Sequence, residues 1–378
     1  MKLKGCAMLV VGVVVTPACS GRYDVGFDPV GGGSAGQSSA GSDAVAAGSP
    51  SSAGTTSPSG GTGSGGSAVS SEGGEAPTTA PGRCGFEPDL ADPGVAATAS
   101  SAVVAARIDH FLDDTTAAAA GALPSKPTAA WAAERAMSIL DAHLQAKTEA
   151  AGLVRFLTHW LAVPANADPL TAPHTWSMKL LDPQATLSTL LAEPTGQPHR
   201  FGVLTEKDVL AARPTITGRG KWMVSHLFCQ EVPPPPPGVP AITPGTTGVT
   251  RREKLDGSVS SPSCQACHGV IDPPGDSLEH FDAVGNYRDL DAGQAVDSAA
   301  TIAEPKFSFD DFEALAPQLA ESCAVSQCFT QQLLADSNSE NLAFTAEETN
   351  HVANVFANAN FSIRELIKAV VTTPTFLR

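Results

Sequence analysis

Beyond residue 100, apolar residues recur at the three- and four-residue spacing that places them on one face of an α-helix. The clearest set comprises Leu153, Phe156, Leu157, Trp160 and Leu161. Similar spacing predicts helices within residues 104–112, 131–140, 218–228, 312–319, 329–334 and 363–371. Alternation of apolar and polar residues, which would indicate half-buried strands, is scarce. The pattern therefore predicts a mostly α fold.

Helix starts are marked by a second kind of signal. A Ser or Thr followed three residues later by an acidic residue is typical of a capping box, which satisfies the first free N–H groups of a helix. Such patterns begin at Thr205, Thr250, Thr345 and Ser362. Between them lies a run of five prolines, residues 233–237, which favours a stiff polyproline II segment. We interpret this run as a spacer between two helical units.

The first 83 residues follow a different pattern. Lys2 and Lys4 precede an apolar run from Gly5 to Val15, and small residues then lead to Ala18 and Cys19. This order is typical of a secretory signal peptide, and the position of Cys19 resembles the lipidation site of a bacterial lipoprotein. The alternative is an ordinary secretory peptide cut nearby. We expect a signal peptide at residues 1–18 and a lipid on Cys19.

Residues 19–83 are rich in Gly and Ser and poor in large apolar residues. Such a segment buries too little apolar surface to offset the entropy lost on ordering, so it predicts a disordered tether. Together with the signal, it indicates an extracytoplasmic protein that is anchored to a bacterial membrane rather than spanning it. The anchored protein would face the periplasm or the cell surface.

The charge balance excludes two classes of partner. The chain has 39 acidic and 23 basic residues, a net charge of −16. Residues 1–83 hold four basic and five acidic residues, so −15 of that charge lies beyond the tether. Binding to nucleic acid or to an anionic membrane surface depends on Lys and Arg, so neither is expected.

The eight cysteines fall into three groups. Cys6 belongs to the predicted signal and Cys19 to the predicted anchor. Another two stand in the motif described next. The remaining four are Cys84, Cys229, Cys323 and Cys328. In an oxidising compartment, an even number of cysteines predicts disulfides, here two, although the sequence leaves all three pairings open.

The segment Cys264-Gln265-Ala266-Cys267-His268 matches Cys-x-x-Cys-His, the attachment motif of c-type haem. Two thiols three residues apart on one helical turn can form thioethers with the two vinyl groups of a haem, and the adjacent His can bind the iron as the proximal ligand. Because haem c is attached after export in bacteria, the predicted signal and the motif agree. The motif therefore predicts one covalent haem c on Cys264 and Cys267, with His268 as iron ligand.

Three other uses of the two cysteines have weaker support in the sequence. A thioredoxin-like redox pair would need a surrounding βαβ pattern, which the sequence lacks. A zinc site would need a second ligand pair at suitable spacing. A structural disulfide remains an alternative, although it would leave the adjacent His268 without a purpose.

The segments around the motif resemble a known family. They are Arg251–Leu255, Pro262–His268, Ile271–Gly275 and Leu278–Arg288. Their order resembles the planctomycete-type cytochrome c domain, also called domain of unknown function 1588. The helical segments before them resemble domain of unknown function 1592, and residues 312–329 and 361–376 resemble domain of unknown function 1585.

The resemblance implies a division of the chain beyond the tether. A helical N-terminal domain would span residues 84–232 and a Pro-rich spacer residues 233–249. A cytochrome-c-like haem-binding domain would follow at 250–303, and a small helical C-terminal domain at 304–378. The implied function is haem-linked redox chemistry, and the resemblance supplies no substrate.

The second axial ligand would decide the class of that chemistry. No Met follows His268, and the downstream histidines are His280 and His351; Met223 and His226 lie upstream. We expect a packing or solvated role for His280, with His280 and His351 kept as distal candidates. Electron transfer is favoured over catalysis. The alternatives are a haem-dependent redox enzyme, such as a peroxidase or the electron-accepting subunit of a dehydrogenase, and a binding or assembly module with structural haem.

Four acidic residues follow the motif, at Asp272, Asp276, Glu279 and Asp282. We expect turn chemistry rather than acid–base work here, with caps or turns at Asp272-Pro273 and at Asp282-x-x-Gly285. The acidic body would suit a basic redox partner.

Overall fold

The computed structural model describes residues 83–86, 98–112, 122–162, 170–234, 245, 247–337 and 342–378. The predicted signal peptide, Cys19 and all of the predicted tether up to residue 82 lie outside these ranges. In the described part, no helix is long and apolar enough to cross a membrane.

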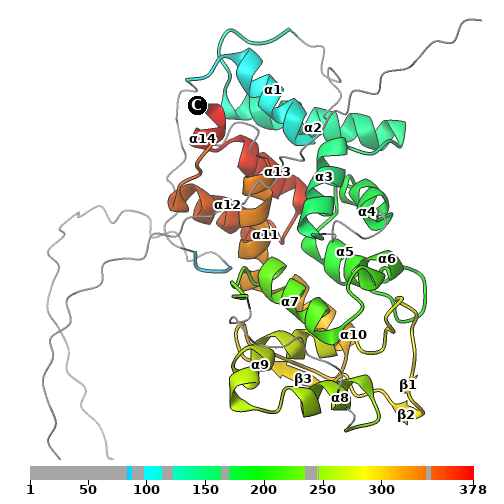
Figure 1. Ribbon diagram of the computed structural model, residues 1–378. Helices are drawn as coiled ribbons and strands as arrows, with labels where there is room; N and C mark the ends of the chain where they lie inside the picture. The colour runs from blue at the N-terminus through cyan, green and yellow to red at the C-terminus, as the bar shows by residue number, and fades with distance from the viewer. Residues whose placement is uncertain are drawn as a thin grey trace, which may run out of the picture. The chain divides into compact units, whose positions relative to one another are not determined.

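The fold is mostly helical, as the sequence predicts (Figure 1). The first seven α-helices and one 3-10 turn are α1 Ser101–Leu112, α2 Ala129–Ala146, α3 Ala151–Trp160, α4 Ala172–Leu180, α5 Leu187–Leu191, η1 Val203–Thr205, α6 Lys207–Ala211 and α7 Ile216–His226. The remaining helices are α8 Arg251–Ser258, α9 Pro262–Asp276, α10 Phe312–Ala320, α11 Cys323–Asp336, α12 Ala346–Asn358, α13 Ile363–Val371 and α14 Pro374–Leu377.

Two short antiparallel hairpins lie between α9 and α10. β1 (Leu290–Asp291) pairs with β2 (Gln294–Ala295), and β3 (Ala300–Ile302) pairs with β4 (Phe307–Phe309). In the second hairpin Ala300 lies opposite Phe309 and Ile302 opposite Phe307. These hairpins agree with the scarcity of strand patterns in the sequence.

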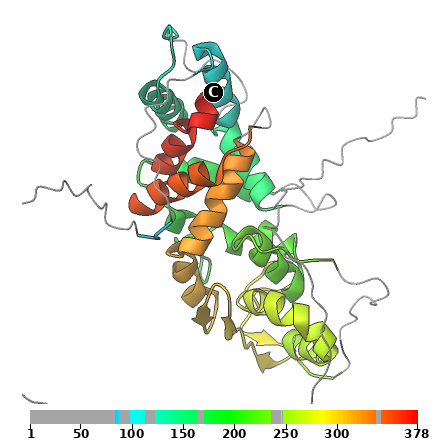
Figure 2. The same ribbon diagram turned by 90° about the vertical axis from the view of Figure 1, so that its left-hand side faces the viewer.

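The C-terminal helices pack against the N-terminal ones. α13 contacts α2, α11 contacts α3, and α14 contacts α1. The last helices of the chain therefore share one core with α1, α2 and α3. The Arg107 guanidinium donates a hydrogen bond of 2.8 Å to the carbonyl of Phe376 inside this contact. α1, α2, α13 and α14 lie together in both views, whereas α8, α9 and the strands gather in another region (Figures 1 and 2).

A cluster of aromatic rings links α7 to this helical core. Trp160 of α3 lies edge-on to both Trp222 of α7 and Phe329 of α11, with ring centroids 5.5 Å apart in each pair. The Trp222 indole N–H donates to the carbonyl of Trp160, and the Trp160 indole N–H to that of His226, both at 3.2 Å. α7 is therefore held by hydrogen bonds as well as by apolar packing.

Two disulfides also join distant segments at α11. Cys84 bonds to Cys323 and Cys229 bonds to Cys328. The expectation of two disulfides from these four cysteines is confirmed, and the structure supplies the pairing that the sequence left open. Disulfides of this kind are typical of proteins outside the reducing cytoplasm.

Of the four capping-box predictions, two are confirmed in full. Thr250 and Thr345 each form both hydrogen bonds of the box. Ser362 forms only the half that accepts from the backbone N–H of Glu365, because the Glu365 side chain pairs with Lys368 instead.

The prediction at Thr205 is wrong. Thr205 is fully buried, and its hydroxyl bonds to the backbone of Phe201, so Glu206 occupies the N-cap of α6 without a side-chain bond. Asp208 instead accepts a hydrogen bond of 3.0 Å from the backbone N–H of Ala172 at the start of α4. A tertiary contact has therefore replaced the local cap.

Candidate functional site

The Cys-x-x-Cys-His segment lies on the first two turns of α9. Ser261 caps the helix, because its hydroxyl accepts a hydrogen bond of 3.4 Å from the backbone N–H of Cys264. Pro262 occupies the first helical position, where a residue without an N–H costs nothing. The predicted helical turn of the motif therefore belongs to α9, which begins at Pro262, two residues before the first cysteine.

The two halves of α9 differ in burial. No residue from Pro262 to Val270 is buried, although the segment contains Ala266 and Val270. From Ile271 to Asp276, by contrast, every residue except Pro273 is buried. The motif therefore lies on a stretch of helix that the described protein leaves uncovered, continuous with a stretch that is firmly packed.

Both motif cysteines carry free thiols. Cys264 is half-buried and Cys267 is exposed, and no disulfide joins them. Residues three apart on an α-helix lie on nearly the same face, separated by a rise of about 4.5 Å. The two thiols therefore lie one turn apart on the uncovered half of α9.

The His268 side chain is held in place by a carboxylate. Its Nδ1 lies 2.8 Å from Oδ2 of Asp272, one turn further along α9, and only 12% of the His268 side chain is exposed. Because an ionised carboxylate can only accept, Nδ1 donates and the lone pair of the neutral ring lies on Nε2. Nε2 is the nitrogen that remains for a metal.

Asp272 is itself fixed from a second helix. Its Oδ1 accepts a hydrogen bond of 2.8 Å from the hydroxyl of Thr217 on α7. Burial raises the pKa of the Asp272 carboxyl, while the hydrogen bonds from Thr217 and His268 act in the opposite direction. The sequence expectation that Asp272 forms a cap or turn is wrong, because α9 continues through Pro273 and Pro274 to Asp276.

Glycines allow α7 and α9 to approach closely. A Cβ on Gly220 would lie 1.6 Å from the carbonyl oxygen of Ile271, and one on Gly275 would lie 2.1 Å from that of Ile216. Neither position could carry a side chain without moving backbone. This contact brings Thr217 to Asp272, and it joins two helices that the predicted domain boundaries assign to different domains.

Two buried acidic residues, Asp276 at the end of α9 and Glu279 just beyond it, lie beside arginines. Asp276 lies 3.5 Å from Arg252 of α8, and Glu279 lies 2.9 Å from Arg288. Burial raises the pKa of Asp276 to about 8, and Arg252 only partly offsets that effect. Burial also raises the pKa of Glu279, against the opposing influence of Arg251 and Arg288.

Asp282, in contrast, forms the predicted turn. Its Oδ1 accepts hydrogen bonds from the backbone N–H groups of Val284 and Asn286, at 3.0 and 2.8 Å. Gly285 within this turn adopts a φ of +78°, a conformation that favours glycine. The Asp-x-x-Gly expectation is therefore confirmed.

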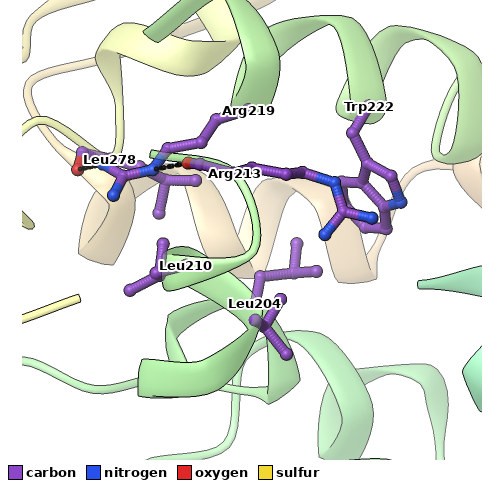
Figure 3. Close-up of a pocket in the computed structure, with 7 residues that line it drawn as sticks. Leu204, Leu210, Arg213, Arg219, Trp222 and Leu278 are labelled. Atoms are coloured by element: carbon purple, nitrogen blue, oxygen red, sulfur yellow. Dashed lines mark hydrogen bonds between the residues drawn. The ribbon is translucent and has the colours of Figure 1, made fainter. Parts of the chain in front are cut away.

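Arg219 of α7 fixes the segment that follows α9. Its guanidinium, only 1% exposed, donates to the carbonyls of Leu278, Phe281 and Asp282 at 3.0, 2.7 and 2.6 Å. Figure 3 shows the bond to Leu278 and a further one to Arg213. Desolvation lowers the pKa of Arg219 to about 10, so the side chain still carries its charge at neutral pH.

A small cavity beside Arg219 is not part of the motif. It is lined by Leu204, Val209, Leu210, Arg213, Arg219, Trp222 and Leu278 (Figure 3). It leaves only about 10 Å³ of free space, enough for about one water molecule and far below the roughly 300–1,000 Å³ of typical small-molecule pockets. No motif residue lines it, so it is separate from the uncovered half of α9.

The candidates for the distal ligand, His280 and His351, have their described contacts with residues outside the Cys-x-x-Cys-His motif. His280 lies beyond the end of α9, where Nδ1 donates to the carbonyl of Arg288 at 3.0 Å and the ring stacks on Tyr287. His351 lies on α12, which packs against α11 and α13 (Figure 2). Met223 is fully buried, and His226 stacks on Trp222. The identity of the second axial ligand remains a prediction.

Sequence reasoning missed Thr217 and Arg219. Both lie on the helix before the proline run, more than 40 residues from the motif, so spacing around the motif could not reveal them. A usable signal was the pair Gly218 and Gly220 within a helical pattern, since helix-interior glycine often marks a close approach.

One comparison with known proteins gives a match. Residues 200–291 match the family described as PSCyt3, a protein of unknown function (DUF1588). This segment is thus similar to a planctomycete-type, cytochrome-like family whose function is unknown. No curated protein and no solved structure matches the chain. The matched segment begins 50 residues before the expected haem-binding domain, and it includes both α7 and α9.

Proposed function

We propose that this chain carries one covalent haem c, attached through Cys264 and Cys267 with His268 as proximal ligand, and that it transfers single electrons outside the cytoplasm. The observation that carries the proposal is the state of His268. Asp272 holds its Nδ1 at 2.8 Å, which leaves Nε2 as the ligand nitrogen, directly beside a helical turn with two free thiols. A structural cysteine pair would need no such arrangement of its neighbouring His.

The uncovered half of α9 supports the same proposal. Most residues from 262 to 270 are exposed, including Cys267 and the 50% exposed Val270, whereas Cys264 is half-buried and only 12% of the His268 side chain is exposed. A flat apolar cofactor attached there would cover surface that is otherwise left to water, and this burial is favourable. The buried half of α9 would hold the attachment point rigid.

Haem bound at this site would supply a one-electron redox centre. The residues of the chain would have three tasks. The thiols of Cys264 and Cys267 would anchor the group, Nε2 of His268 would bind its metal, and Asp272 would keep Nδ1 protonated. His280 and His351 remain candidates for the opposite side.

The location and partners belong to the same proposal. The lipid on Cys19 would hold the protein at a bacterial membrane, and the residues up to 83 would act as a tether. The net charge of −15 beyond residue 83 favours a basic redox partner and disfavours nucleic acid. Electron transfer between such partners should slow as salt is added.

A reduced-minus-oxidised spectrum and a pyridine haemochrome assay test the proposal. The full chain is secreted in a bacterium that has a c-type maturation system. We expect one c-type haem per chain, with an α-band that appears on reduction. A purified chain without that band would overturn the proposal. Added carbon monoxide then separates the two haem functions, because an electron carrier with both axial positions filled binds it poorly, whereas an open site binds it readily and indicates a haem enzyme.

A further inference from the structure

The hydrogen-bonded series from Thr217 to Asp272 to His268 crosses between two helices. Thr217 of α7 donates to Oδ1 of Asp272, and His268 donates to Oδ2, both at 2.8 Å. Each carboxylate oxygen therefore receives one donor. Only 9% of the Asp272 side chain and 12% of the His268 side chain are exposed, so water competes weakly for these bonds.

Rigid backbone fixes the geometry of this series. Asp272 and His268 are one turn apart on α9, so their distance follows from the helix itself. The distance from Asp272 to Thr217 follows from the α7–α9 contact, which Gly220 and Gly275 keep too close for any other side chain. The arrangement is therefore present in the folded chain before any cofactor binds.

We propose that Asp272, held by Thr217, is a positioning residue that directs Nε2 of His268 to the iron and lowers the reduction potential of the site. The inference rests on the proposed function. A carboxylate hydrogen-bonded to a ligating imidazole fixes the tautomer and ring orientation and makes the ligand more basic. A more basic ligand beside a buried negative charge stabilises the oxidised iron more than the reduced iron, so the potential falls.

The first test needs no haem. The full chain is produced without haem attachment, with ¹⁵N-labelled histidine, and the His268 signals are identified by their loss in His268→Gln. We expect the Nδ1–H tautomer in the wild type and a shift towards the Nε2–H tautomer in Asp272→Ala. An Nε2–H tautomer in the wild type, or a tautomer that Asp272→Ala leaves unchanged, would overturn the positioning role.

The second test measures reduction potentials of the haem-loaded full chain by spectroelectrochemical titration. Asp272→Asn keeps the shape of the side chain and removes its charge, so we expect a shift to higher potential. Thr217→Val removes only the outer hydrogen bond, and we expect a smaller shift in the same direction. Asp276→Asn is the control for the substitution itself, because it replaces an aspartate by asparagine one turn further along α9, at a carboxyl that contacts Arg252 rather than His268.

The outcomes of the two tests separate the two proposals. An Asp272→Asn potential equal to that of the wild type, or shifted no further than that of Asp276→Asn, would overturn this inference. If Asp272→Asn does not fold, Thr217→Val decides the question, and an unchanged potential in that variant counts against the inference. A wild-type chain that takes up no haem would defeat the proposed function, whereas the tautomer measurement would still decide whether Asp272 orients His268.

Discussion

Helices α11 and α9 each carry a pair of cysteines, yet the two pairs have different fates. On α11, Cys323 and Cys328 are five residues apart, and both are joined to distant parts of the chain. On α9, Cys264 and Cys267 are three apart, and both remain thiols. The α11 pair is bonded to other segments of the chain, whereas the α9 pair forms no disulfide and lies on the less buried half of its helix.

The difference shows how spacing and environment assign a role to the same residue type. Cys84 and Cys229 lie within bonding reach of α11, so that helix becomes a junction between the start of the folded chain, the end of α7 and the C-terminal helices. Within the described part of the chain no disulfide includes either thiol of α9, and His268 directly follows them in the sequence. In an oxidising compartment thiols seldom stay free, and the proposed haem would be a covalent partner for this pair.

The largest expected effect separates the two pairs by haem content. Cys264→Ala/Cys267→Ala should remove all covalent haem from the secreted chain, because no thioether can form. Cys229→Ala/Cys328→Ala removes the same number of sulfurs and should retain haem in whatever fraction folds. Haem staining of denaturing gels measures both. Equal staining of the two double variants would contradict the claim that only the α9 cysteines attach haem.

The second prediction concerns stability, which we expect the Cys229–Cys328 pair to affect more than the Cys264–Cys267 pair. In the chain without haem, Cys229→Ala/Cys328→Ala should lower the free energy of unfolding by about 2–5 kcal/mol, since this disulfide closes a long loop, with its cysteines 99 residues apart in sequence. Cys264→Ala/Cys267→Ala should change it by roughly 0.5 kcal/mol or less, because neither thiol is buried. Denaturant unfolding gives both values. A large loss from the α9 variant would indicate a structural role for its cysteines.

A third prediction concerns the packed half of α9. Gly220→Ala should cost about 3 kcal/mol, at the upper end of overpacking, because its Cβ would meet the Ile271 carbonyl. Gly269→Ala on the uncovered half is the control. The nearest atom to its Cβ would be 3.7 Å away, and alanine is the better helix former, so a gain of roughly 0.5–1 kcal/mol is expected. A similar loss in both variants would contradict the division of α9 into two halves.

A fourth prediction is a pH dependence from the same packed half. Burial raises the pKa of Asp276 from 3.8 to about 8, so the folded chain holds this proton more tightly than the unfolded chain. Its contribution to stability is complete below about pH 4 and is lost as the pH rises towards 8. Stability should therefore fall less steeply between pH 5 and 9 in Asp276→Asn than in the wild type. If the two proteins instead lose stability with pH at the same rate, as measured by denaturant unfolding, Asp276 is not the source of this pH dependence.

Apolar periodicity predicted helices such as α3 and α13 correctly, because each of them buries one continuous stripe of residues. Local signals failed where a tertiary contact replaced them. Thr205 turned inward to bond Phe201, and the Asp272-Pro273 pair continued a helix that its sequence favours ending. The disulfide pairing and the contact of Thr217 with Asp272 join segments 55 to 239 residues apart, which no local pattern encodes. The motif itself was visible in the sequence, whereas the groups that hold its His were not.

The central claim is that Cys264 and Cys267 bind haem rather than each other, and one peptide tests it directly. Trypsin releases residues 255–288 as a single fragment that contains both cysteines and His268, because no Lys or Arg lies between Lys254 and Arg288. Mass spectrometry of this fragment from the secreted, matured protein should show the added mass of one haem. A fragment that has instead lost two hydrogens, as a Cys264–Cys267 disulfide would, contradicts the account.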